Sequence, residues 1–335
     1  MDSYKNAGVD VEAADKYVGT IAEAVTSSWG ANVVGGFGGF AAGITLPPGF
    51  TNPVLMMSTD GVGTKLEIAR LMSDYSSVGI DLVAMCVDDL AAVGARAIAF
   101  TDYIAVGRLD PSRERTIVES VAQACASIDC ALLGGETAEH PGMVETHHVD
   151  LAGAALGIVE AGQEITGHEI RPGDHIIGIA SPNVRSNGFS LIRKVVDDLH
   201  ETLPGTDRPI GSVLLEPSVI YTPAVLALAE AELATGFAHV TGGGLPGNAG
   251  RPLPAGLGAR IDTSTWQPPA VFGWLAEKGG ISNENMFGTF NMGIGFVVIT
   301  RPDRAASVYD ALSEYGHSAY GIGTIAETSE LVRFF

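Results

Sequence analysis

At 335 residues the chain is long enough for two domains and for a core without disulfides or a structural metal, so we expect Cys86, Cys125 and Cys130 to be reduced core residues of a cytoplasmic protein. The formal net charge of −20, from 39 acidic and 19 basic residues, disfavours nucleic-acid binding because a polyanion is repelled. The acidic N-terminus is unlike a signal peptide, and prolines and glycines break the longest uncharged stretch, so we expect neither secretion nor a membrane-spanning helix.

The first half of the chain alternates strand-like and helix-like segments. Continuous apolar runs predict buried strands, and apolar residues at helical spacing predict amphipathic helices. The predicted elements are a strand at 53–59, a helix at 80–95, a strand at 97–106, a helix at 111–129, and strands at 130–135 and 150–160.

A polar segment with glycine and proline, residues 164–174, predicts a linker. The elements predicted after it are a strand at 175–181, helices at 187–199 and 221–233, a strand at 293–300, a helix at 303–316 and a strand at 318–327. This order predicts an α/β protein of the α+β type with two mixed domains. We place the domains at residues 1–168 and 169–335, and no sequence repeat relates them.

Three carboxylates directly follow strand-like apolar runs: Asp60 after VLMMST, Asp102 after AIAFT and Glu136 after ALLGG. Strand ends often share one edge of a sheet, so these acids are expected to converge with acids of the helix at 80–95. Hard oxygen ligands of this kind suit Mg²⁺ that bridges to phosphates. The alternative is that they are solvated loop acids, since turns favour aspartate. Their joint occurrence beside glycines favours the metal site.

Two glycine-rich segments of the first half match neither common nucleotide-binding motif. In GGFGGF, residues 35–40, the dinucleotide pattern G-x-G-x-x-G would need glycine where Ala41 stands, and no clear strand precedes it. DGVGTK, residues 60–65, lacks the phosphate-loop spacing G-x-x-x-x-G-K. We therefore expect a flap without regular structure that closes over a nucleotide.

Two segments of the second half suit either a helix cap or a phosphate site. SNGFSL, residues 186–191, puts serine and asparagine at the start of a predicted helix. HVTGGGLPGN, residues 239–248, presents three consecutive glycines after a strand-like run. Each alone is more often a cap or a turn. His147 and His148 have no partner at metal-site spacing, which favours a surface loop.

Taken in order, YKNAGVD, GGFGGF, STDGVGTK, GIDLVAMCVDDL, LLGGETAEHPGM, SNGFSL, TGGG and MFGTFNMGIG closely resemble the phosphoribosylformylglycinamidine cyclo-ligases, or aminoimidazole ribonucleotide synthetases, of purine biosynthesis. The resemblance runs from Tyr4 to beyond residue 295. It implies that ATP phosphorylates the formyl amide oxygen of formylglycinamidine ribonucleotide to an iminophosphate, and that the amidine nitrogen then closes the imidazole ring. It also implies the two-domain fold of that superfamily and a homodimer paired through the N-terminal half.

The resemblance implies roles for individual residues. It implies catalytic roles for Lys65, Asp89 and His239. It implies that Asp60, Asp89 and Glu136 bind Mg²⁺, with K⁺ as a further candidate ion. The ATP site would comprise Gly35, Gly36, Gly38, Gly39, Phe40, Asp60, Gly61, Gly63, Thr64 and Lys65. The ribonucleotide site would comprise Ser186, Asn187, Gly188, Thr241, Gly242, Gly243, Gly244 and Asn291.

The sequence departs from the usual family pattern beside these motifs. His140 and Val144 stand where relatives typically have methionine and tyrosine, Arg185 where histidine is common, and residues 245–247 where a bulkier aromatic version is usual. These departures concern substrate contacts rather than the class of reaction.

Other readings fit the sequence less well. The same superfamily includes a hydrogenase-maturation dehydratase, selenophosphate synthetase and thiamine monophosphate kinase. Selenophosphate synthetases need a reactive cysteine near the N-terminus, whereas the first cysteine here is Cys86. The kinase does not explain why GGETAEHPGM and SNGFSL both match the cyclo-ligases. The combination of Asp60, Lys65, Asp89 and Glu136 argues against a non-catalytic nucleotide sensor.

Overall fold

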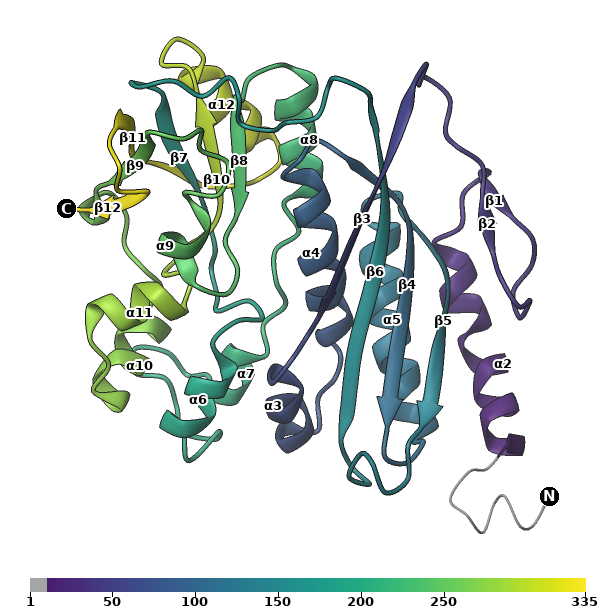
Figure 1. The fold of residues 1–335 in the computed structure, drawn as a ribbon. Coiled ribbons are helices and arrows are strands. Elements are labelled where there is room, and N and C mark those ends of the chain that lie inside the picture. The colour runs from purple at the N-terminus through teal and green to yellow at the C-terminus, as the bar shows by residue number, and fades with distance from the viewer. Residues whose placement is uncertain (1–10) are drawn as a thin grey trace. The chain divides into compact units, whose positions relative to one another are not determined.

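The computed structural model describes residues 11–335, so the motif at residues 4–10 lies outside them. Contacts divide the chain into two compact units. Unit 1 runs up to Leu90 and resumes over Arg96–Ala161, while unit 2 contains Ala91–Ala95 and Gly162–Phe335. Both units mix strands and helices, which confirms the predicted fold class (Figure 1). Among the described residues, no helix has the length and apolar character needed to cross a membrane.

Unit 1 contains a four-stranded sheet with the strand order β3-β6-β4-β5. Its strands are β3 (Pro53–Gly61), β4 (Arg96–Val106), β5 (Ala131–Glu139) and β6 (Val149–Glu160). Its helices are α2 (Val11–Ser27), α3 (Lys65–Met72), α4 (Val78–Ala91) and α5 (Pro111–Ala126). Strands β4 and β5 are parallel and are joined through α5, because parallel neighbours need a crossover connection. The four strands and the helices α4 and α5 confirm the predicted order.

The two faces of this sheet differ in character. A Cβ at Gly153 would meet the side chain of Leu82, so one face packs against α4. On the opposite, outer face, Leu55, Met57 and Tyr103 are 52%, 75% and 42% exposed. Exposed apolar side chains that share one face usually mark an interaction surface.

The expected irregular flap is wrong in one respect. Two short strands, β1 (Val33–Val34) and β2 (Gly43–Ile44), pair antiparallel on either side of the glycines. The flap is therefore the loop of a small hairpin, and a strand does precede it. Strands of two residues carry too little pattern to be recognised from the sequence. The structure leaves Phe40 fully exposed at the flap.

Unit 2 contains a six-stranded sheet with the order β12-β9-β11-β7-β10-β8, antiparallel except for the β12–β9 pair. Its strands are β7 (His175–Ala180), β8 (Gly236–His239), β9 (Leu257–Ile261), β10 (Ile294–Thr300), β11 (Ala319–Glu327) and β12 (Val332–Phe334). Its helices are α6 (Phe189–Val195), α7 (Ile210–Leu214), α8 (Thr222–Glu230), α9 (Gly244–Asn248), the 3₁₀ helix η1 (Thr263–Thr265), α10 (Ala270–Gly279), α11 (Asn283–Thr289) and α12 (Ala305–Glu314).

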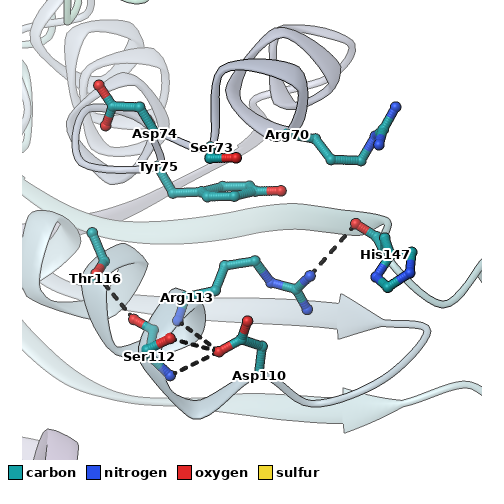
Figure 2. A pocket seen from close by; sticks show the side chains of 9 residues that line it. All are labelled: Arg70, Ser73, Asp74, Tyr75, Asp110, Ser112, Arg113, Thr116 and His147. Atoms are coloured by element: carbon teal, nitrogen blue, oxygen red, sulfur yellow. Dashed lines mark hydrogen bonds between the residues drawn. The ribbon is translucent and has the colours of Figure 1, made fainter.

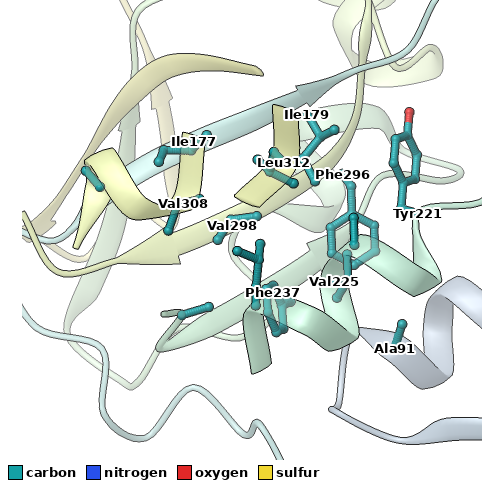
Figure 3. Close-up of a cluster of buried hydrophobic side chains, with 14 residues drawn as sticks. Ala91, Ile177, Ile179, Tyr221, Val225, Phe237, Phe296, Val298, Val308 and Leu312 are labelled. Carbon is teal, nitrogen blue, oxygen red and sulfur yellow. The ribbon is translucent and has the colours of Figure 1, made fainter. Parts of the chain in front are cut away.

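The core of unit 2 lies between this sheet and the helices α8 and α12. Val225 from α8 and Leu312 from α12 pack with Ile179 and Phe296 from the central strands (Figure 3). Tyr221, at the start of α8, is fully buried in the same cluster. This core anchors the ends of β7, β8 and β10, from which the loops of the candidate substrate site leave.

Helix α6 is shorter than predicted. The sequence predicted a helix over residues 187–199, but α6 begins at Phe189 and ends at Val195. Gly188 adopts a left-handed conformation, with φ of 82°, and breaks the helix before its first turn. After the helix, the Asp198 carboxylate accepts from the backbone N–H of His200 at 2.8 Å, a local bond that favours a turn.

Candidate active site

The Asp60–Lys65 segment forms the turn between β3 and α3. Asp60 lies next to the end of β3, and its Oδ1 accepts from the N–H of Gly61 at 2.7 Å. Gly63 has a φ of 66°, a conformation that favours glycine, and Gly63 and Thr64 are exposed. The turn thus presents backbone to solvent, as a phosphate site requires.

The side chain of Lys65, by contrast, does not face solvent. It is the first residue of α3, and its Nζ lies 2.6 Å from Oδ2 of Asp81 on α4. Both side chains are completely buried. The ammonium group therefore compensates a carboxylate inside unit 1, an ion pair that sequence reasoning did not identify.

Asp60 and Asp89 both act electrostatically on the thiol of Cys86. The pKa of the Cys86 thiol is raised to about 12, first by burial and then by the negative charge of Asp60, with a smaller contribution from Asp89. Both carboxylates must lie near the thiol to act on it. Two carboxylates with substrate phosphates and waters are a usual ligand set for Mg²⁺, so the chemistry of this pair fits that ion.

Glu136 belongs to a different part of unit 1. Asp60 is on β3 and Glu136 on β5, the two opposite edges of the sheet. Three strand spacings separate these edges, or about 14 Å. Within residues 11–335, no three histidine, cysteine or acidic side chains come close enough to hold a metal ion. The three predicted metal ligands therefore do not meet within one chain.

Glu136 and the glycine flap instead line the same pocket. A cavity of about 630 Å³ is bounded by α2, by β5 and by flap residues that include Gly36, Gly38, Gly39 and Phe40. This volume is in the range of small-molecule sites. The pocket brings the flap and Glu136 together, but the turn of residues 60–65 does not line it.

Asp102 also lines this pocket and was not among the assigned site residues. Burial raises the pKa of its carboxyl group to about 7. A Cβ at Gly135 would lie 1.7 Å from Oδ1 of Asp102, so glycine at 135 leaves room for the carboxylate. The position of Asp102 after the apolar run AIAFT was a signal for this site, although the residue lies within β4 rather than at its end, and its burial could not be read from sequence.

A second cavity in unit 1, of about 480 Å³, is lined by none of the assigned residues. Figure 2 shows that its charged groups bond to nearby protein groups: the Asp110 carboxylate accepts from Ser112 and Arg113, and Arg113 donates to the backbone carbonyl of His147. Arg70 forms a bidentate ion pair with Glu67 beside it. Because these charged groups already have partners within the protein, we interpret this cavity as a gap in the packing near α3 and α5.

In unit 2, the loop of residues 183–188 is fixed by a network of amide hydrogen bonds. The side chain of Asn291 donates to the carbonyl of Asn183 at 2.9 Å, and its own oxygen accepts from Gly293 at 2.7 Å. Asn183 in turn accepts from the N–H of Arg185 at 3.0 Å. Asn291 therefore holds the loop, a role different from direct contact with substrate.

Glycine is required at two positions of this site. Gly188 has a φ of 82°, and a Cβ there would lie 2.2 Å from the ring of Phe290. Gly244 has a φ of 57°, and a Cβ would lie 2.0 Å from the carbonyl oxygen of Phe287. By contrast, Gly242 is exposed, and its Cβ would meet no atom within 4 Å. The carbonyl groups of Gly242 and Gly244 are bound by the amide of Asn248, at 3.1 and 2.8 Å.

Ser186 has a side chain that suits a ligand. The residue is only 7% exposed, and none of the described residues forms a hydrogen bond with its hydroxyl oxygen. An unsatisfied buried hydroxyl costs about 1–3 kcal/mol unless a partner is supplied. The neighbouring Asn187 is half-buried. The predicted motif SNG therefore contains a polar group with capacity for a bound molecule.

Comparisons with known proteins address the family directly. Residues 41–159 match the model of the AIR synthase related protein, N-terminal domain, and residues 171–334 match the C-terminal domain. The phosphoribosylformylglycinamidine cyclo-ligase of Synechocystis sp. (strain ATCC 27184 / PCC 6803 / Kazusa) is 43% identical over 97% of both chains, and that of Geobacillus kaustophilus (strain HTA426) is 44% identical over 97% of this chain and 96% of its own. The chain belongs to the phosphoribosylformylglycinamidine cyclo-ligase family. The predicted family is thereby confirmed.

Solved structures agree on the fold of this family member. The thiamine-monophosphate kinase from Stenotrophomonas maltophilia K279a is 18% identical with a TM-score of 0.71, covering 94% of this chain and 95% of its own. The hydrogenase maturation protein HypE in complex with ATP is 17% identical with a TM-score of 0.67, covering 98% and 90%. At such identities the likeness establishes the fold alone.

Proposed function

We propose that this protein catalyses the ATP-dependent closure of formylglycinamidine ribonucleotide to aminoimidazole ribonucleotide in purine biosynthesis. The observation that carries the proposal is membership of the cyclo-ligase family at 43% identity over 97% of the chain, across both units. The buried, free cysteines Cys86, Cys125 and Cys130 agree with a reducing cytoplasm as its location.

ATP is assigned to the flap pocket of unit 1. The cavity has a suitable volume, and Phe40, fully exposed on the flap, is available to cover a bound base. Mg²⁺ would be held by Asp60 and Asp89, and when bound it neutralises charge on the phosphates. Lys65 would act indirectly, by pairing with Asp81 and fixing the start of α3 behind this turn. K⁺ is proposed only as an ion to vary in the assay.

The separation of Asp60 from Glu136 favours a homodimer. These residues occupy opposite sheet edges of one chain, so a nucleotide that uses the flap pocket and the Asp60 turn together would draw on two copies. The outer face of the sheet, with Met57 and Tyr103 exposed, would supply the apolar contact between them.

The ribonucleotide is assigned to the loops of unit 2. The hydroxyl of Ser186 and the side chain of Asn187 would bind its 5′-phosphate, together with the backbone of the half-buried Thr241 and of the exposed Gly242 and Gly243. Backbone N–H groups are effective anion donors where no side chain blocks the approach. His239 would complete the site from the end of β8.

The proposed reaction moves one phosphoryl group and closes one ring. The formyl oxygen of the substrate takes the γ-phosphoryl group of ATP, and ADP leaves. The amidine nitrogen then attacks the activated carbon, phosphate departs with the former formyl oxygen, and one proton is released. No residue needs to form a covalent bond, so the protein contributes positioning and charge compensation.

Measurement of ADP release distinguishes this proposal from a thiamine monophosphate kinase and from a nucleotide sensor. With Mg²⁺ and ATP present, formylglycinamidine ribonucleotide should stimulate ADP formation by the purified protein, whereas thiamine monophosphate should not. A nucleotide sensor would give no stimulated hydrolysis with either compound. Stimulation by thiamine monophosphate alone would favour the kinase and overturn the proposal.

A further inference from the structure

Arg185 and His239 form a buried pair in unit 2. They are only 2% and 4% exposed, and Nη2 of Arg185 lies 2.9 Å from Nε2 of His239. The same guanidinium donates through Nη1 to the carbonyl of Val219 at 3.1 Å. Its central carbon lies 4.9 Å from the centre of the Tyr221 ring. The side chain of Arg185 is thus held at three points.

The chemistry of this contact fixes the proton on His239. A guanidinium group remains protonated in proteins and can only donate hydrogen bonds. Nε2 of His239 must therefore accept, which leaves the single proton of the neutral imidazole on Nδ1. A doubly protonated His239 would place two donors against each other at 2.9 Å. The histidine ring also stacks on Phe296, with 5.9 Å between centroids, which restricts its rotation.

The backbone at Arg185 is held in an unusual conformation. Its φ of 63° is unusual for a residue other than glycine, and its N–H donates to the side chain of Asn183 at 3.0 Å. The hydroxyl of Tyr221 donates to the carbonyl of Ala180 at 2.9 Å, which fixes the ring against which the guanidinium lies. Strain of this kind persists where the surroundings determine the conformation.

We propose that Arg185 is a positioning residue that fixes His239 as the neutral Nδ1–H tautomer. In this form the lone pair of Nε2 is engaged by Arg185 and is not available as a base. The catalytic consequence rests on the proposed function, whereas the tautomer does not depend on it.

Nitrogen NMR of the full-length protein labelled at histidine tests the tautomer without any assay of activity. The His239 signals, identified by their loss in His239→Asn, should show the proton on Nδ1. Arg185→Lys should preserve this form, because an ammonium group is also only a donor, whereas Arg185→Met should allow the Nε2–H form. Arg301→Met, which removes another arginine of unit 2 that pairs with Asp174, should leave the His239 signals unchanged. An Nε2–H form in the wild type, or no change in a folded Arg185→Met, would overturn the proposal.

A separate assay of turnover keeps the two proposals apart. A wild type without cyclo-ligase activity would overturn the proposed function, and the tautomer measurement would still test the Arg185–His239 hydrogen bond.

Discussion

Asp102 is a single residue at which pH should control the stability of the protein. Its folded pKa of about 7 lies above the ordinary value of 3.8, so between these two values the native state holds a proton that the unfolded state has lost. The free energy of unfolding should therefore fall as the pH rises from about 4 to about 7, by up to about 4 kcal/mol, and then level off.

The variant Asp102→Asn should remove this dependence, because its side chain is neutral at every pH. Denaturant unfolding at about pH 5 and about pH 8 should show a smaller difference for the variant than for the wild type, with the variant the more stable at the higher pH. Asp303→Asn, at an exposed position of unit 2, serves as the control and should leave the difference unchanged. An Asp102→Asn protein with the wild-type pH dependence would contradict the burial of this charge.

Lys65 provides a second prediction at the residue scale. Lys65→Met removes the ammonium group that pairs with the buried carboxylate of Asp81, so the free energy of unfolding should fall by about 3–5 kcal/mol. The double variant Lys65→Met/Asp81→Leu should recover most of this loss, since an apolar pair can replace a buried ion pair. Arg70→Met breaks the partly exposed pair with Glu67 and should cost less than about 1 kcal/mol. A stable Lys65→Met single variant would show that the ion pair is not formed in solution.

At the scale of elements, variants in the glycine-containing loops of unit 2 distinguish a glycine needed for packing from one proposed to bind substrate. Gly188→Ala places a methyl group against Phe290 at a positive φ and should destabilise the protein by about 2 kcal/mol or more. Gly242→Ala meets no neighbouring atom, so its thermal stability should match the wild type. If the backbone at 242 binds the substrate phosphate, Gly242→Ala should raise the KM for the ribonucleotide about tenfold and leave that for ATP unchanged. An unchanged KM for the ribonucleotide in this stable variant would show that the loop is a turn with no role in binding.

Elements with a long, regular pattern could be predicted from the sequence, and those set by distant contacts could not. Helix α5 follows from its proline start and its apolar spacing, and β3 from an unbroken apolar run. Helices α7 and α9 have five residues each and contain glycine, which is too little for a helical period. The edge positions of β3 and β5 depend on strand order, which no local pattern encodes. For this reason the sequence could propose Asp60 and Glu136 as ligands but could not place them on opposite edges.

At the scale of the whole molecule, the exposed outer face of the unit 1 sheet predicts a homodimer. Met57→Glu places a charge at the 75% exposed Met57 on this face and should shift the protein to monomers in sedimentation. The control Met143→Glu changes a side chain that is 85% exposed in the turn between β5 and β6, and should leave the oligomeric state unchanged. A wild type that sediments as a monomer, or a dimer that survives Met57→Glu, would place the contact elsewhere or exclude it.

Formation of the ring product tests the central claim most directly. The purified protein, given formylglycinamidine ribonucleotide, ATP and Mg²⁺, should form aminoimidazole ribonucleotide and ADP in equal amounts, with no product when any one of the three is omitted. This result is expected because the family relationship extends over 97% of the chain and includes both the turn at residues 60–65 and the loops to which we assign the ribonucleotide. ADP formed without the aminoimidazole product, or no turnover by a folded protein, would contradict the assignment.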